Sequence, residues 1–124
     1  MLPQGALFSV AALACLAAGR PFAPIDRNYP RMRTLKVLEE LGPGAIIVEQ
    51  ASDAHDLDGR APCIDIERSL NSADILRPMT SNPDAPALIL YTSGTTGEPK
   101  GICNSQRAIL QRVVQATNSC QISS

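Results

Sequence analysis

The sequence predicts a layered α/β fold with a mainly parallel sheet and flanking helices. Apolar runs with helical spacing alternate along the chain with short runs rich in β-branched residues, an order typical of such folds. The chain has 124 residues, of which 44% are hydrophobic and 19% are charged, so it carries enough apolar side chains for a core. This length fits one modest domain, and the sequence contains no internal repeat.

An apolar run over residues 6–18 opens the chain, and we predict that it forms a buried helix. Alanine and leucine, two strong helix formers, dominate the run, and Gly19 supplies a C-terminal stop. The same residues resemble the apolar core of a secretory signal, which leaves a small exported protein with a signal-like N-terminus as an alternative. The residues before the run include no Lys or Arg, and the run is too short to span a membrane, so the helix is favoured.

The middle of the chain predicts one amphipathic helix and two short strands. Residues 21–26 are extended, and their two prolines confine them to a strand end or a sheet edge, where Asp26 accepts nearby backbone N–H groups. A helix is predicted over residues 30–41, with Pro30 at its first position and Gly42-Pro43 at its end. Strands follow at 45–48 and 63–66, separated by a polar surface loop at about 50–62. The predicted apolar stripe of the helix consists of Met32, Leu35, Leu38 and Leu41.

The last third predicts two strands around a Gly/Thr-rich loop, and then a helix. A polar connector at about 71–86 leads into an apolar strand at 87–91. The loop spans residues 91–101, a short strand covers 100–103, and a helix runs from about 106 to 116.

Composition excludes several classes of function. The net charge is -1, there are four Phe and Tyr residues and no Trp, and no basic stripe is present, so we predict neither nucleic-acid binding nor membrane binding. The four cysteines are widely spaced without a CxxC pair, which favours reduced thiols in a cytoplasmic protein. The acidic residues between 53 and 65 only partly match a calcium loop, and we predict no metal site there. No catalytic residue is identified.

The loop YTSGTTGEPKG, residues 91–101, has the composition of a phosphate-binding site. Its glycines allow successive backbone N–H groups to face one concavity, its hydroxyls donate to phosphate oxygens, and its lysine adds a positive charge. Pro99 stands where a Walker loop needs glycine, so this is a different kind of loop. A Gly/Ser/Thr segment that only connects two strands is the alternative. The predicted ligands of the phosphates are Thr92, Ser93, Gly94, Thr95, Thr96, Gly97 and Lys100.

Two motifs resemble those of the AMP-forming adenylating enzymes. ALILYTSGTTGEPKG, residues 87–101, is similar to the phosphate-loop signature of that superfamily. LAAGRPFAPIDRNYP, residues 16–30, resembles a motif of nonribosomal peptide synthetase adenylation domains, and Arg33 stands where those domains often have Arg. The two motifs occur in the order of the family, which weakens the reading of residues 6–18 as a signal peptide.

The resemblance implies a fold, a reaction and partners. Residues 1–124 are expected to be a partial AMP-binding (adenylation) domain, an incomplete piece of the large N-terminal domain of these enzymes. The implied reaction uses ATP and Mg²⁺ to join a carboxylic or amino acid to AMP, releases pyrophosphate, and then passes the acyl group to CoA or to a carrier-protein phosphopantetheine thiol. A non-catalytic nucleotide-binding remnant is the alternative. Gln106-Arg107 departs from the His-Arg pair that is common in the family, which leaves the acyl-site role of that position in doubt.

Overall fold

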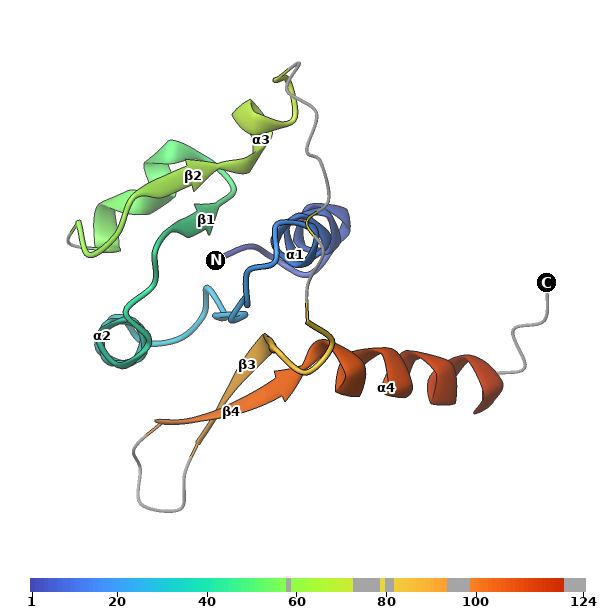
Figure 1. Cartoon of the computed structure of the whole chain (residues 1–124). Coiled ribbons are helices and arrows are strands. Elements are labelled where there is room, and N and C mark those ends of the chain that lie inside the picture. The colour runs from blue at the N-terminus through green and yellow to red at the C-terminus, as the bar shows by residue number, and fades with distance from the viewer. Residues whose placement is uncertain (58, 73–78, 80–81, 94–98, 120–124) are drawn as a thin grey trace.

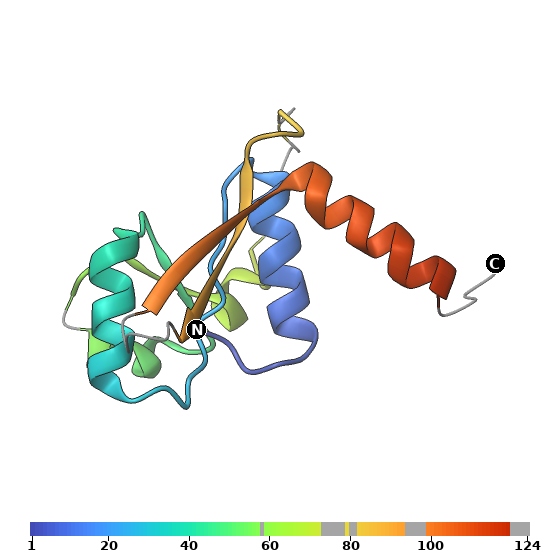
Figure 2. The same ribbon diagram turned by 90° about the horizontal axis from the view of Figure 1, so that it is seen from below.

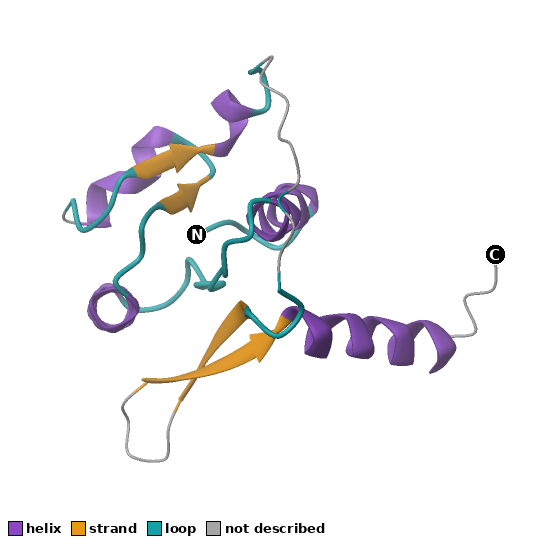
Figure 3. Cartoon of the chain, viewed as in Figure 1, coloured by secondary structure: helices purple, strands orange, loops and turns teal. Residues whose placement is uncertain are grey.

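The computed structural model describes residues 1–57, 59–72, 79, 82–93 and 99–119 (Figure 1). In these residues β1 (Ile46–Val48) pairs in parallel with β2 (Cys63–Asp65), and β3 (Pro86–Ser93) pairs antiparallel with β4 (Pro99–Ser105). Helices and loops make up the rest (Figure 3). The α/β class is confirmed. The strands on either side of residues 94–98 form a hairpin, because two strands joined by so short a connection can pair only in opposite directions.

Helix α1 (Ala6–Ala17) confirms the predicted helix but differs from it in burial. Within its twelve residues, all of which the structure describes, only Ala11 is buried, while Leu13 is 66% exposed. Packing comes from one side, where the Phe8 ring meets the Phe22 ring edge-on, with 6.4 Å between centroids. The described elements therefore cover one face of an apolar helix and leave the opposite face in solvent.

Helix α2 (Arg31–Leu41) lies close to its predicted bounds and ends as its sequence indicates. Gly42 adopts the left-handed conformation with φ of 53°, and its N–H donates to the Leu38 carbonyl at 3.0 Å. The predicted apolar stripe is wrong at Met32, which is 67% exposed, because the helix turns another face to the core. The residues of that buried face are Thr34, Leu35, Val37 and Leu38.

The core lies between α2 and the parallel pair, and two short helices stand next to these strands in the chain. The 3₁₀ helix η1 (Ala51–Leu57) falls inside the predicted surface loop and contributes Leu57, which is 2% exposed. Helix α3 (Ile66–Ser69) begins where the predicted strand 63–66 was expected to end, since Asp65 accepts from the Arg68 backbone N–H at 2.9 Å and caps it. The buried core residues are Ile25, Val37, Leu38, Ile46, Val48 and Leu57.

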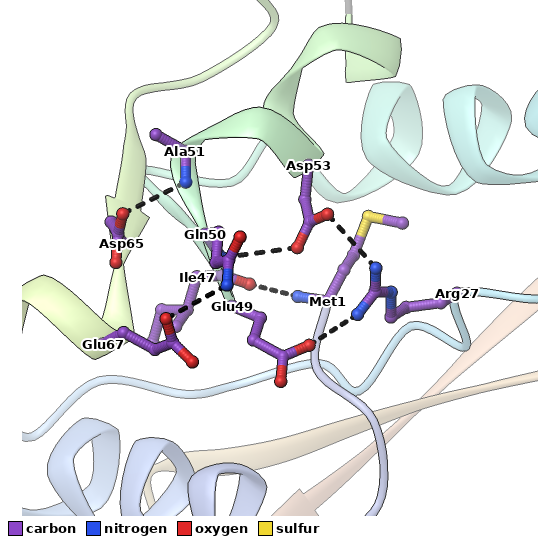
Figure 4. Close-up of polar contacts among 9 residues, drawn as sticks. All are labelled: Met1, Arg27, Ile47, Glu49, Gln50, Ala51, Asp53, Asp65 and Glu67. Carbon is purple, nitrogen blue, oxygen red and sulfur yellow. Dashed lines mark hydrogen bonds and ion pairs between the residues drawn. The ribbon is translucent and has the colours of Figure 1, made fainter.

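A polar cluster joins the start of the chain to the parallel pair (Figure 4). The Met1 ammonium donates to the Ile47 carbonyl, and burial lowers the pKa of this amine. Arg27 forms ion pairs with Glu49 at 2.7 Å and with Asp53 at 3.1 Å. These contacts hold the extended segment before α2 against β1 and η1.

Helix α4 (Gln106–Ser119) extends away from the other elements in both ribbon views (Figures 1 and 2). Within this helix, which the structure describes in full, no residue is buried. Leu110, Val113 and Val114 are 58%, 55% and 58% exposed and fall on one stripe of the helix. In the residues that the structure describes, no helix is long and apolar enough to cross a membrane.

Candidate functional site

The β3–β4 hairpin brings the two ends of the predicted phosphate loop together. Its last pairs set Thr92 directly opposite Lys100, and Ser93 opposite Pro99. Thr92 and Lys100 are both exposed. The strands extend into the predicted loop from both sides, so the connection between them is reduced to residues 94–98. Of the predicted ligands, Gly94, Thr95, Thr96 and Gly97 lie outside the described residues.

One pair further from the loop, the Tyr91 ring lies against Gly101. The two residues face each other across the hairpin, and a Cβ atom on Gly101 would be 3.3 Å from Tyr91 Cζ and 3.4 Å from its hydroxyl oxygen. Tyr91 is half-buried against the core cluster. Burial, with a smaller effect from the Glu40 carboxylate, raises the pKa of the Tyr91 hydroxyl.

The far end of the hairpin is held by an ion pair between Asp84 and Arg107. Arg107 Nε donates to Asp84 Oδ1 at 2.7 Å and Nη2 donates to Oδ2 at 3.1 Å, so the guanidinium engages both carboxylate oxygens. Its hydrogen bond holds the pKa of the Asp84 carboxyl below its usual value. The backbone N–H of Arg107 also donates to the Pro83 carbonyl at 2.9 Å. Sequence reasoning missed this pair, because only the antiparallel pairing brings these two distant residues together.

The departure from the family pattern at Gln106 lies at the first turn of α4. The Gln106 backbone N–H donates to the Ala85 carbonyl at 3.3 Å, and Gln106 lines a small hollow together with Arg20 and Asn82. Ser105 Oγ accepts from the Ala108 backbone N–H at 3.3 Å, which caps the helix. Position 106 therefore lies beside the residues that follow α1 and the segment that leads into β3.

The remaining candidate residues are Asp26, the cysteines and the acidic residues between 53 and 65. Asp26 Oδ1 accepts from the Asn28 backbone N–H at 2.9 Å, which confirms the predicted role of that carboxylate. Cys15, Cys63 and Cys103 are free thiols, and Cys120 lies outside the described residues. No group of three or more His, Cys, Asp or Glu side chains within the described ranges is arranged to hold a metal ion, and Asp58 falls in a gap between those ranges.

Several known proteins are similar to this chain in sequence and in fold. Bacitracin synthase 3 of Bacillus licheniformis is 36% identical over 107 residues, which are 86% of this chain and 2% of that protein. The nonribosomal peptide synthetase FmoA3 in its AMPPNP-bound form superposes with a TM-score of 0.81 at 28% identity, over 99% of this chain and 13% of that one. O-succinylbenzoate coenzyme A synthetase of Bacillus subtilis, in complex with ATP and magnesium, superposes with a TM-score of 0.84 at 24% identity, over 99% of this chain and 26% of that one.

The chain thus spans a small part of each of these proteins, and all three comparisons cover most of its own length. Residues 1–123 match the model of a protein family that is described as AMP-binding enzyme. Sequence motifs, hairpin geometry and fold agree with this match, and the chain belongs to the AMP-binding enzyme family.

Proposed function

We propose that this chain supplies the phosphate-binding part of an AMP-forming, carboxylate-activating enzyme. The observation that carries the proposal is the pairing of Thr92 with Lys100 at the mouth of the Gly/Thr loop. A hydroxyl and an ammonium group, both exposed, begin and end a segment whose composition suits polyphosphate. By this proposal the loop holds the β- and γ-phosphates of ATP through Thr92, Ser93, Gly94, Thr95, Thr96, Gly97 and Lys100.

The proposed reaction places the greatest demand on these donors as pyrophosphate leaves. An oxygen of the substrate carboxylate attacks the α-phosphorus of ATP, and the bond from that phosphorus to the bridging oxygen of pyrophosphate breaks. Negative charge grows on the departing pyrophosphate, so donors already aimed at it favour the transition state. In the second half-reaction a thiol, from CoA or a carrier protein, takes the acyl group and releases AMP.

The family match and the nucleotide-bound neighbours support ATP as the substrate of this site. The neighbour solved with ATP and magnesium supports Mg²⁺ as the accompanying ion. The described residues offer no carboxylate cluster for that ion, so we assign it no ligand in this chain. A non-catalytic nucleotide-binding role is the second candidate.

The test uses a completed domain, defined as residues 1–124 joined to the remaining segments of an AMP-binding domain. Thr95→Val keeps the shape of the side chain and removes its hydroxyl, and Lys100→Ala removes the ammonium. Each change is expected to slow acyl-adenylate formation roughly ten- to a hundredfold, or about 1.4–3 kcal/mol, because a charge-assisted partner of pyrophosphate is lost. Thioester formation from supplied acyl-adenylate should hardly change, because pyrophosphate has already left. Pyrophosphate exchange and thioester formation are measured separately.

Lys36→Ala, which removes a lysine from the exposed side of α2, is the matched control and should leave both half-reactions unchanged. Unchanged adenylation in Thr95→Val and Lys100→Ala would overturn the assignment of the loop. Carboxylate-dependent exchange by the 124-residue chain alone would instead show that the added segments are not needed for adenylation. A completed domain that binds ATP and catalyses neither half-reaction would favour the non-catalytic candidate.

A further inference from the structure

We propose that Tyr91 and Gly101 form a positioning pair that sets the separation and tilt of Thr92 and Lys100. The Tyr91 ring, held by the core on one side, rests on the Gly101 backbone on the other. This contact fixes the position of the next pair of residues in β3 and β4, which is Thr92 and Lys100. The inference rests on the proposed function, because it concerns how that loop is aimed at phosphate.

The evidence begins with the space around Gly101. A Cβ atom there would meet the Tyr91 ring at 3.3 and 3.4 Å and the Ile89 side chain at 3.5 Å. The first distance is shorter than an ordinary van der Waals contact between carbon atoms. Gly101 does not have the positive φ found at Gly19, Gly42 and Gly59. The tight space at 101 therefore comes from the ring beside it and not from a left-handed backbone.

Tyr91 cannot move away freely, because its other side is packed. The ring lies against the core cluster, in which Val37 and Leu38 of α2 are 1% and 2% exposed. The Glu40 carboxylate, also on α2, is close enough to affect the ionisation of the Tyr91 hydroxyl. Because a Cβ atom at Gly101 would be so close to the ring, a methyl group added there would displace the β4 backbone, the ring, or both by a few tenths of an ångström.

A displacement of the ring or of the β4 backbone also moves the neighbouring proposed ligands, Thr92 and Lys100. Thr92 follows Tyr91 and Lys100 precedes Gly101, and successive residues of a strand point to opposite faces. The ring therefore lies on the core face of the hairpin, and the side chains of Thr92 and Lys100 lie on the solvent face. A shift of a few tenths of an ångström at the contact changes the separation and tilt of these two groups, and phosphate contacts depend on such geometry.

The experiment introduces Gly101→Ala into the completed domain and measures steady-state and half-reaction kinetics. The KM for ATP is expected to rise about tenfold, well below the roughly hundredfold loss that a 1 Å misplacement can cause. The KM for the carboxylic acid and the rate of thioester formation should stay unchanged. Gly44→Ala is the matched control, because a Cβ there meets nothing within 4 Å and Gly44 has no positive φ. It should leave all of these constants unchanged.

Tyr91→Leu tests the same contact by changing the ring instead of the glycine. Alone it removes the ring atoms beside Gly101 and should also raise the KM for ATP. Combined with Gly101→Ala, it makes room for the added methyl group and should recover at least half of the loss in apparent ATP affinity. A general loss of folded protein would instead lower both half-reactions equally, leave the KM for ATP unchanged, and show no recovery in the double variant. That pattern would overturn the positioning role.

Lys100→Ala in the same assay separates this inference from the function on which it rests. If Lys100→Ala raises the KM for ATP and Gly101→Ala does not, the positioning pair is wrong and the phosphate site stands. If neither change alters the KM for ATP or the adenylation rate, the loop does not bind the phosphates and both proposals fail. If both raise it and the double variant recovers, both proposals are supported.

Discussion

The Tyr91 hydroxyl couples the stability of the hairpin to pH. Burial and the Glu40 carboxylate both disfavour its ionised form, so the pKa of Tyr91 in the folded chain lies above the ordinary tyrosine value of about 10. Because the folded state then holds the proton more tightly than the unfolded state, ionisation of this group favours unfolding. Its contribution is fully present below the unfolded pKa and is lost as pH rises through the folded pKa.

We therefore expect the stability of the completed domain to fall as pH rises above about 10, the unperturbed pKa of tyrosine. Tyr91→Phe removes the titrating group and should make the dependence on pH shallower over that range. Denaturant midpoints of the two proteins between neutral and alkaline pH provide the measurement. Parallel curves for wild type and Tyr91→Phe would show that the Tyr91 hydroxyl does not contribute.

Single residues also show where sequence reasoning reached its limit. The role of Asp26 could be predicted because its partner, Asn28, is two residues away. The exposure of Met32 could not be predicted, because helical spacing identifies an apolar stripe and does not show which part of that stripe a neighbouring element covers. Helical spacing also did not show that the Arg33 guanidinium lies 4.2 Å from the centre of the Tyr29 ring or that this residue is half-buried.

At the scale of elements, the start of α4 depends on one serine. Ser105 precedes the helix, and its Oγ accepts from the backbone N–H of Ala108, one of the donors that the first turn leaves unpaired. Replacing Ser105 by Ala should destabilise the first turn by about 1 kcal/mol, within the range typical of such caps. Amide hydrogen exchange should become faster at residues 107–109 and stay unchanged in β1 and β2.

Ser119→Ala is the control for this change, because its hydroxyl donates to the Gln115 carbonyl at the other end of the same helix. It should leave exchange at residues 107–109 unaffected. Equal effects of the two substitutions would mean that the Ser105 hydroxyl does not act as a cap.

The elements that sequence predicted well are those whose signals are local. The bounds of α2 follow from Pro30, an apolar spacing and Gly42, all within one segment. The helix η1 and the helix α3 were not predicted, because each is only a few residues long and depends on contacts with the parallel pair. The antiparallel pairing of β3 with β4 was also missed, although the connection between the two predicted strands is too short for parallel pairing.

For the molecule as a whole, the sequence located the candidate site and not its surroundings. The residue types of the Gly/Thr loop and its family signature stand together in one short segment. The Tyr91–Gly101 contact and the Asp84–Arg107 ion pair depend on the folded hairpin, so no local pattern could reveal them. The ion pair joins the residues before β3 to the residues after β4, and the contact joins the first and last residues of the predicted loop.

The 124-residue chain on its own is expected to self-associate and to unfold without a sharp transition. The stripe of Leu110, Val113 and Val114 is more than half exposed along a helix that contacts little besides the hairpin. Exposed apolar surface of this kind favours association, and the short two-stranded sheets of the described chain add unpaired edges. Sedimentation velocity over a range of concentrations, together with thermal unfolding followed by circular dichroism, measures both properties.

Two pairs of substitutions on α4 separate the apolar stripe from charge alone. Leu110→Lys with Val114→Lys places two charges on the stripe and should shift the chain toward monomer. Gln111→Lys with Gln115→Lys adds the same charge at the same spacing, one position further along the helix, where the stripe is left intact. If the stripe drives association, the second variant should associate like the wild type, because its apolar surface is unchanged. A wild-type chain that sediments as a single monomer and melts in one cooperative step would contradict this expectation.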